Sequence, residues 1–400
     1  FMGYTPNDVL QYVQEEDVKF IRLAFCDVFG RQKNISIMPG ELPRAFADGI
    51  AIDSSAVAGF GGEVFSDLLL FPDPATISLL PWRPEHGRVV RMFCALRCPD
   101  GSPFRMDCRA LLRDAVADAS EQGISFSFGS ETEFYLFKRD LEGNPTKEPQ
   151  DNASYMDIAP EDRGENIRRE ICLTLEQMGI QPERSHHEQG PGQNEVDFHY
   201  ADPLTAADNA VTFRAVVNTI AARNGLYADF SPKPLPGAPG NGMHISLSAK
   251  AKTGDPMPQI LAGILKYVPE MTLFLNPAES SYHRLGSDKA PRHICWSECN
   301  RTALIRIPAA KGEYVRSEVR SPDPACNPYL AFALLIRAGL AGIREQLPLP
   351  EPARRNLFRD PGSHALLPGT LAEAARLAKS STFLKACLPE ELLKAYCREI

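Results

Sequence analysis

The sequence has no apolar run of the roughly 18 residues needed to span a membrane, and it does not begin with a signal-peptide pattern. We therefore expect a cytoplasmic protein. It also has no excess of basic residues, because 43 Lys and Arg against 51 Asp and Glu give a formal charge of −8 at pH 7. This balance argues against binding to nucleic acid or to an anionic membrane.

Cysteine motifs and common nucleotide-binding loops are missing as well. Ten cysteines spread over 400 residues are too sparse for a disulfide scaffold, and the Cys94/Cys98 and Cys295/Cys299 pairs lack the two-residue spacing of common zinc sites. We expect reduced thiols. Neither a Walker-type glycine loop nor a dinucleotide fingerprint occurs, so any nucleotide must be held in another way.

The chain is long enough for two domains, and its character changes near residue 98. Residues 1–98 are predicted to be mainly β, with a hairpin of 18–30 and 32–37 and a strand over 88–97. Residues 99–400 alternate predicted helices and strands, which indicates an α+β protein. Helices are predicted over 107–123, 162–178, 203–224 and 328–346. Strands are predicted over 124–137, 192–200, 243–248, 301–307 and 313–320.

Acidic side chains recur on the predicted strands of the second part. Glu131 and Glu133 lie two residues apart among phenylalanines, so both carboxylates project from one face of a buried strand. Such like charges are costly unless a cation lies between them, which favours a metal site over a solvated strand edge. Glu195 and Asp197 are two residues apart on a predicted strand, so both point to one face. For this pair a solvated face is as good an interpretation as a metal site. His244 taken alone is weak support for a ligand.

Arginines cluster towards the C-terminal part of the chain. Arg316 and Arg320 flank Glu318 at alternate positions of one predicted strand, which is compatible with a structural ion-pair ladder. The alternative is a clamp for phosphate or carboxylate groups, to which guanidinium offers bidentate geometry. Three more candidates are Arg284, Arg301 and Arg306. Phosphoryl transfer requires such cations on the phosphates.

Five segments resemble successive signatures of the type I glutamine synthetase family, in the right order. They are GSETEFYLF, SHHEQGPGQNEVDF, SPKPLPGAPGNGMHISLS, NRTALIRIP and RSEVRSPDPACNPYLAFALL. The resemblance implies an α+β fold: a small β-grasp-like N-terminal domain (1–98) and a large catalytic domain (99–400) with an antiparallel sheet flanked by helices. It also implies a homododecamer of two hexameric rings, with active sites between subunits.

The resemblance further implies ATP and two or more divalent cations, Mg²⁺ or Mn²⁺, at each active site. The metal nearer the substrate would be held by Glu133, Glu188 and Glu195. The metal on the nucleotide phosphates would be held by Glu131, His244 and Glu318. Substrate binding falls to Arg284, Arg320, Gly240 and Glu133. ATP binding falls to Arg306, Arg316, Ser248 and Tyr200. Catalytic roles fall to Asp53, Arg301, Glu188 and Tyr155, with Asp53 supplied by the adjacent subunit.

The implied reaction uses ATP to phosphorylate the side-chain carboxylate of L-glutamate, after which ammonia attacks the acyl phosphate and gives glutamine. Four positions depart from the family pattern. A flap that usually reads Glu-Ala-Pro has Lys289 in place of its glutamate, and Ala56 replaces a serine near the ammonium site. Pro239 replaces the Asn before the substrate-binding glycine, and Ser246 replaces a nucleotide-side histidine. One alternative is therefore a γ-glutamyl–amine ligase with a larger nucleophile, and another is a non-catalytic regulatory homologue.

Two departures concern regulation. Phe358 stands where longer type I enzymes carry a modifiable tyrosine, so adenylylation at that position is impossible. Gly62 stands where the short, unmodified subgroup carries a feedback arginine, which argues against glutamine feedback by that route.

Overall fold

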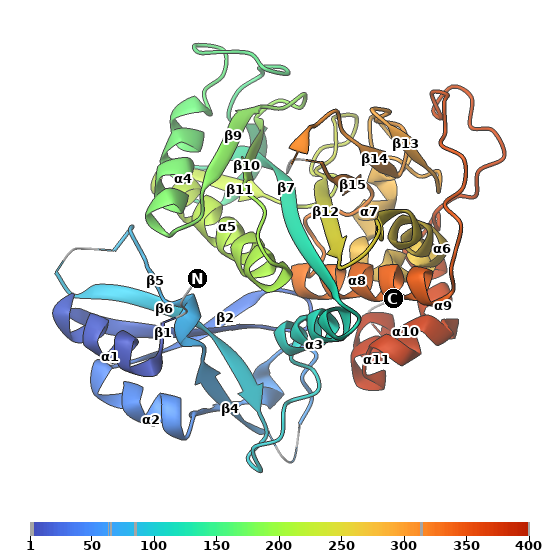
Figure 1. Ribbon diagram of the computed structural model, residues 1–400. Coiled ribbons are helices and arrows are strands. Elements are labelled where there is room, and N and C mark those ends of the chain that lie inside the picture. Colours follow the sequence, from blue (N-terminus) through green and yellow to red (C-terminus); the bar gives the residue numbers. More distant parts are fainter. Residues whose placement is uncertain (1–3, 63, 65, 84–85, 313–314, 399–400) are drawn as a thin grey trace. The chain divides into compact units, whose positions relative to one another are not determined.

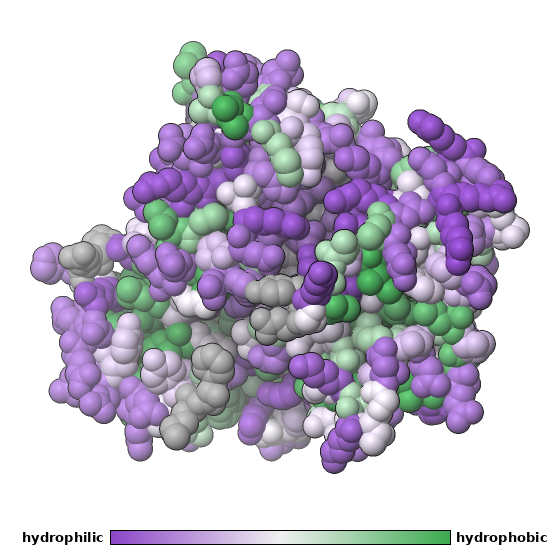
Figure 2. Space-filling model, turned by 45° about the horizontal axis from the view of Figure 1, so that its top comes forward, coloured by the Kyte–Doolittle hydropathy of each residue, from purple (hydrophilic) through white to green (hydrophobic). Residues whose placement is uncertain are grey.

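The structure is a computed structural model that describes residues 4–62, 64, 66–83, 86–312 and 315–398. The chain divides into two compact units, described separately here: Phe1–Leu111 with Leu173–Ile180, and Leu112–Cys172 with Gln181–Ile400. Among the described residues, no helix is long and apolar enough to cross a membrane. Hydrophilic side chains predominate on the face drawn in Figure 2.

The first unit is built on a six-stranded sheet in the order β2-β1-β6-β4-β3, with β5 paired to β6. Its strands are β1 (Val18–Cys26), β2 (Gln32–Ile37), β3 (Ile50–Asp53), β4 (Asp67–Pro72), β5 (Ser78–Leu79) and β6 (Arg88–Arg97). β1 and β2 form the predicted antiparallel hairpin, while β1 and β6 pair in parallel. The β-grasp-like N-terminal fold that the resemblance implies is thus present, with the helices α1 (Pro6–Glu15) and α2 (Leu42–Ala47) beside the sheet (Figure 1).

The second unit contains a nine-stranded sheet in the order β13-β14-β15-β12-β7-β10-β9, with β8 and β11 also paired to β7. Its strands are β7 (Ile124–Arg139), β8 (Pro145–Pro149), β9 (Pro182–His187), β10 (Gln193–Phe198), β11 (Leu226–Asp229), β12 (Met243–Ala251), β13 (Trp296–Glu298), β14 (Ile305–Ile307) and β15 (Ser317–Val319). All pairs are antiparallel except β13 with β14. The predicted antiparallel sheet is therefore confirmed, with one parallel pair at its edge.

Helices cover one face of this sheet. The helices of the chain from residue 108 onward are α3 (Cys108–Glu121), α4 (Glu165–Gln177), α5 (Pro203–Arg223), α6 (Met257–Leu275), α7 (Glu279–Arg284), α8 (Pro328–Arg344), α9 (Leu371–Ser380), α10 (Thr382–Cys387) and α11 (Glu390–Arg398). Phe128 of β7 stacks on Phe332 of α8 at 4.7 Å between ring centroids, and Phe134 meets Phe213 of α5 at 6.2 Å. Even-numbered side chains of β7 thus face the helices, which leaves the opposite face to Glu131 and Glu133.

The structure differs from the sequence prediction in several elements. Strands β14 and β15 are shorter than the predicted 301–307 and 313–320, and residues 313–314 lie outside the described part of the chain. The helices α1, α6 and α9–α11 and the strands β8, β9 and β11 were not predicted. α6 is buried along most of its length, so it lacks the polar stripe that marks a surface helix.

Candidate active site

Two rows of polar side chains cross the open face of the sheet of the second unit. In the first row, Glu195 of β10 lies opposite both Glu133 of β7 and His186 of β9. In the second row, which we call the Arg184 row, Asp197 lies opposite Arg184 and Glu131, and Glu131 lies opposite His244 of β12. Directly opposite residues project to the same face. Strand register therefore gathers residues from four strands.

A third row comes from the other half of the sheet. Glu318 of β15 lies opposite Ser246 of β12 and Arg306 of β14. Its carboxylate accepts hydrogen bonds from Arg306 and Arg320, both at 2.6 Å, and only 2% of its side chain is exposed. Glu318 Oε1 also lies 3.3 Å from His244 Nδ1. One buried carboxylate thus joins two guanidiniums to the histidine.

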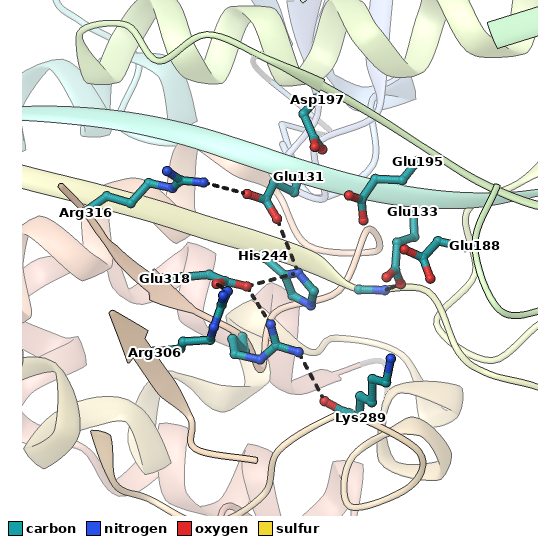
Figure 3. Close-up of polar contacts among 12 residues, drawn as sticks. Glu131, Glu133, Glu188, Glu195, Asp197, His244, Lys289, Arg306, Arg316 and Glu318 are labelled. Carbon is teal, nitrogen blue, oxygen red and sulfur yellow. Dashed lines mark hydrogen bonds and ion pairs between the residues drawn. The ribbon is translucent and has the colours of Figure 1, made fainter. Parts of the chain in front are cut away.

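The predicted nucleotide-side ligands form one group. Glu131, His244 and Glu318 each offer an atom within 4.8 Å of the others. Figure 3 shows His244 between the two carboxylates. Burial alone would raise the pKa of Glu131, but His244, Arg184 and Arg316 together lower it to about 2. Glu131 is therefore an anion available to a cation at neutral pH.

Two of the predicted substrate-side ligands, Glu188 and Glu195, also form a group, and His186, which was not predicted, joins them. His186, Glu188 and Glu195 lie within 4.8 Å of one another, and His186 Nε2 is 2.8 Å from Glu188 Oε1. Glu133 lines the same cavity and accepts a hydrogen bond of 2.6 Å from the backbone N–H of Gly242. In Figure 3 the Glu133 and Glu188 side chains lie next to each other.

The charges of these acids are incompletely balanced by the protein. Burial and the neighbouring Glu188 raise the pKa of Glu133, and burial with the neighbouring Asp197 raises that of Glu195 well above its usual value. Burial and Glu131 raise the pKa of Asp197 to about 7, and its Oδ1 has no hydrogen-bond partner among the described residues. Clustered carboxylates with an unpartnered oxygen fit hard divalent cations such as Mg²⁺ or Mn²⁺.

Most of these groups, though not Asp197, line a cavity of about 750 Å³, within the usual range for small-molecule sites. Twelve of the predicted site residues border it: Glu131, Glu133, Tyr155, Glu188, Glu195, Gly240, His244, Arg284, Arg301, Arg306, Arg316 and Arg320. The Nε atoms of Arg306 and Arg320 have no hydrogen-bond partner among the described residues. Unpartnered guanidinium donors near carboxylate clusters suit anionic groups such as phosphates.

The remaining predicted residues lie elsewhere. Glu318 sits directly behind the cavity wall, where it contacts His244. Tyr200 places its ring 5.6 Å from the guanidinium carbon of Arg316, whereas Ser248 lies farther along β12, opposite Ser127. Asp53 belongs to the first unit, where it caps a short 3₁₀ helix by accepting from Ser55. Their roles stay predictions.

Arg284 is buried, and its guanidinium already donates to two backbone carbonyls, those of Ser321 at 2.7 Å and Arg320 at 3.2 Å. It packs against Gly240, where an added Cβ would lie 2.9 Å from Arg284 Cγ and 2.4 Å from Pro232 O. The close approach explains why glycine is required at 240. Arg284 therefore shapes this wall, and its predicted contact with a substrate carboxylate stays a prediction.

The segment that departs from the family pattern borders the cavity. Lys289 Nζ lies 5.3 Å from the centroid of the Tyr155 ring, and Arg320 donates to the Lys289 carbonyl at 3.4 Å. Asp288 pairs with Lys233 at 2.9 Å. The cavity wall near Tyr155 and Glu188 thus carries an added positive charge.

Two site residues, His186 and Arg184, were missed from the sequence. Both lie on β9, whose polar sequence PERSHH lacks the apolar residues by which a strand is predicted. Their spacing to Glu188 was a usable signal, because Arg184, His186 and Glu188 alternate and so share one face.

Comparison with known proteins shows which class this fold and site define. The family model "Glutamine synthetase, catalytic domain" matches residues 105–399, and "Glutamine synthetase, beta-Grasp domain" matches residues 17–99. The chain belongs to the glutamine synthetase family of ATP-dependent ligases. The boundary predicted between residues 98 and 99 stays a prediction.

The sequence similarity to individual relatives extends over nearly the whole chain. The glutamine synthetase of Methanosarcina mazei is 44% identical over 412 residues, covering 98% of this chain and 92% of the relative. That of Clostridium saccharobutylicum is 42% identical, with coverage of 98% and 93%. A solved structure described as "GmaS/ADP complex-Conformation 1" superposes with a TM-score of 0.89 at 28% identity, covering 98% of this chain and 94% of that one.

Proposed function

We propose that this protein ligates L-glutamate with ammonia through a γ-glutamyl phosphate intermediate, at the expense of ATP, and so makes glutamine. The observation that carries the proposal is the set of three cross-strand rows. They place two carboxylate–histidine groups and a set of arginines around one cavity. Relatives at 40–44% identity named glutamine synthetase support the assignment.

The proposed cofactors are ATP and Mg²⁺ or Mn²⁺. One cation would be held by Glu131, His244 and Glu318, and the other by Glu133, Glu188 and Glu195 with His186 beside them. Bound divalent cations supply positive charge that neutralises phosphate oxygens during transfer. Arg306 and Arg320 line the cavity and are held by Glu318, so their guanidinium groups are positioned there without further ordering.

The proposal is tested by phosphate release from ATP with Mg²⁺ and L-glutamate, comparing ammonium with a panel of primary amines and identifying each product by mass. Glutamine formed with ammonium supports the proposal. Release with a particular amine alone would make the protein a γ-glutamyl–amine ligase. No phosphate release with any nucleophile, in the presence of Mg²⁺ or of Mn²⁺, would favour the non-catalytic, regulatory alternative.

The γ-glutamyl–amine ligase is kept as a second candidate because of Lys289. Its ammonium group stands near Tyr155 in the cavity wall. A fixed positive charge about 4–6 Å from a cationic nucleophile is unfavourable by up to a few kcal/mol near a protein surface. The wall therefore disfavours ammonium and protonated amines, and an amine that is already neutral at working pH is the alternative nucleophile.

Lys289→Glu is expected to lower the KM for total ammonium about tenfold or more at neutral pH, because the substitution replaces repulsion by attraction. Steady-state kinetics at varied ammonium concentration measure the effect. Lys379→Glu makes the same charge change at an exposed position of α9 and serves as the control. An unchanged KM would show that Lys289 does not influence the nucleophile.

We further propose a cytoplasmic homododecamer of two hexameric rings, with Asp53 completing the active site of a neighbouring subunit. Family membership supports this assembly, and Asp53 is exposed and held in place by Ser55. Mass photometry gives the subunit number. Mixing inactive Asp53→Ala subunits with inactive active-site variants should restore part of the activity if active sites are shared.

A further inference from the structure

Arg184 occupies an unusual position in the site, because it is a cation at the end of a row of carboxylates. The Arg184 row runs through Asp197 and Glu131 to His244. Arg184 Nε pairs with Asp197 Oδ2, and its NH2 lies 3.3 Å from Glu131 Oε1. The same guanidinium therefore contacts Glu131, one of the three groups proposed to hold the nucleotide-side cation.

The two carboxylates are much less accessible than the arginine that pairs with them. The side chains of Asp197 and Glu131 are 4% and 16% exposed, whereas that of Arg184 is 50% exposed. Arg184 also lines the cavity. Its guanidinium can therefore leave Glu131 for another anion in the cavity without breaking the packing of a buried side chain.

We infer that Arg184 competes with a divalent cation for Glu131 in the nucleotide-free protein, and that it transfers its contact to the phosphates of a bound nucleotide. This inference rests on the proposed function, since it takes the cavity as a nucleotide and metal site. Arg184 then couples the two ligands: bound nucleotide removes the competitor from Glu131 and strengthens binding of the cation. By linkage, the cation strengthens nucleotide binding by the same factor.

Arg316 makes a useful contrast. It also approaches Glu131 Oε1, at 3.4 Å, but only 13% of its side chain is exposed. Its guanidinium carbon lies over the Tyr200 ring. A guanidinium held by packing on an aromatic ring is less able to move than one at a half-exposed position. The exchange is therefore assigned to Arg184.

The test is calorimetric titration of the full-length protein with Mn²⁺, with and without saturating ADP, and titration with ADP at fixed Mn²⁺. In Arg184→Ala, the affinity for Mn²⁺ without nucleotide should rise about three- to tenfold, and the affinity for ADP should fall by a similar factor. The gain in Mn²⁺ affinity caused by ADP should shrink accordingly. Added salt should reduce the difference between variant and wild type.

Two further variants keep the result interpretable. Arg355→Ala is the control, because Arg355 also pairs with an aspartate, Asp360, at 2.6 Å, and lies outside the cavity. The Arg355 side chain is 72% exposed. This variant should bind both ligands as the wild type does. Arg184→Ala/Asp197→Asn removes both members of the buried pair at once, in case the single variant does not fold. It too should lose most of the ADP dependence of Mn²⁺ binding.

The inference would be overturned if the wild type binds Mn²⁺ and ADP and the Arg184→Ala variant binds both with the same affinities. The proposed function would then still stand. Weaker Mn²⁺ binding in that variant would also overturn it, because competition predicts the opposite sign. A wild-type protein that binds neither Mn²⁺ nor ADP would instead overturn the proposed function.

Discussion

Glu318→Ala is expected to abolish measurable turnover and to destabilise the fold. Glu318 is 2% exposed and accepts from Arg306 and Arg320 at 2.6 Å each. Its loss removes a proposed metal ligand and leaves buried guanidinium groups without their acceptor. Breaking a buried ion pair in this way typically costs about 3–5 kcal/mol. Separately from this loss of stability, losing charge stabilisation at a reacting phosphate lowers the rate by a factor of about 100 to 1,000.

Activity and stability have to be measured separately for this variant. Phosphate release reports turnover, and a denaturant midpoint reports folding at a matched protein concentration. Glu318→Gln preserves the shape of the side chain, so it should retain more stability than Glu318→Ala while turnover remains low. Glu298→Ala, at an exposed position of β13, is the matched control and should change neither. Near-normal turnover in Glu318→Ala would contradict the assigned site.

Gly263→Ala is expected to produce a large loss of stability for the addition of a single methyl group. Gly263 of α6 faces α8 so closely that an added Cβ would lie 2.1 Å from Ala338 O and 2.8 Å from the Gly342 N. These are backbone atoms, so the helices must separate. Overpacking of this kind costs about 1–3 kcal/mol or more, which outweighs the gain of about 1 kcal/mol that alanine brings to a helix interior.

The measurement is the shift of the urea midpoint, with circular dichroism to check that the helices are retained. Gly40→Ala is the control, because a Cβ at Gly40 meets no heavy atom within 4 Å. That variant should unfold at the wild-type midpoint or slightly above it. If Gly263→Ala proved as stable as Gly40→Ala, the close packing of α6 on α8 would be wrong.

Strands with clear alternation were predictable from local sequence. β6 coincides with the predicted 88–97, and β7 extends the predicted 124–137 by two residues. α8 lies within the predicted 328–346 because Asn327 caps its start and its apolar residues are continuous. The short strands β14 and β15 were overestimated, since flanking polar residues leave no local signal for where a strand ends.

The candidate site was predictable to the extent that its residues alternate on one strand. Glu131 and Glu133 share a face by their spacing alone. His186 and Arg184 were missed because β9 has few apolar residues, so no hydrophobic pattern marks it. The pairing of β9 with β10 gives these two residues their partners.

By itself, the sequence determined the spacing of side chains along each strand, the absence of a Walker-type loop and the family signatures. These properties depend on neighbouring residues and on residue type. Only the tertiary structure decided which carboxylate faces which histidine or arginine. That choice depends on strand register, which is set by backbone hydrogen bonds between segments far apart in the chain, as between β7 and β12. A shift by one residue would turn Glu131 and Glu133 towards the helices and remove the site.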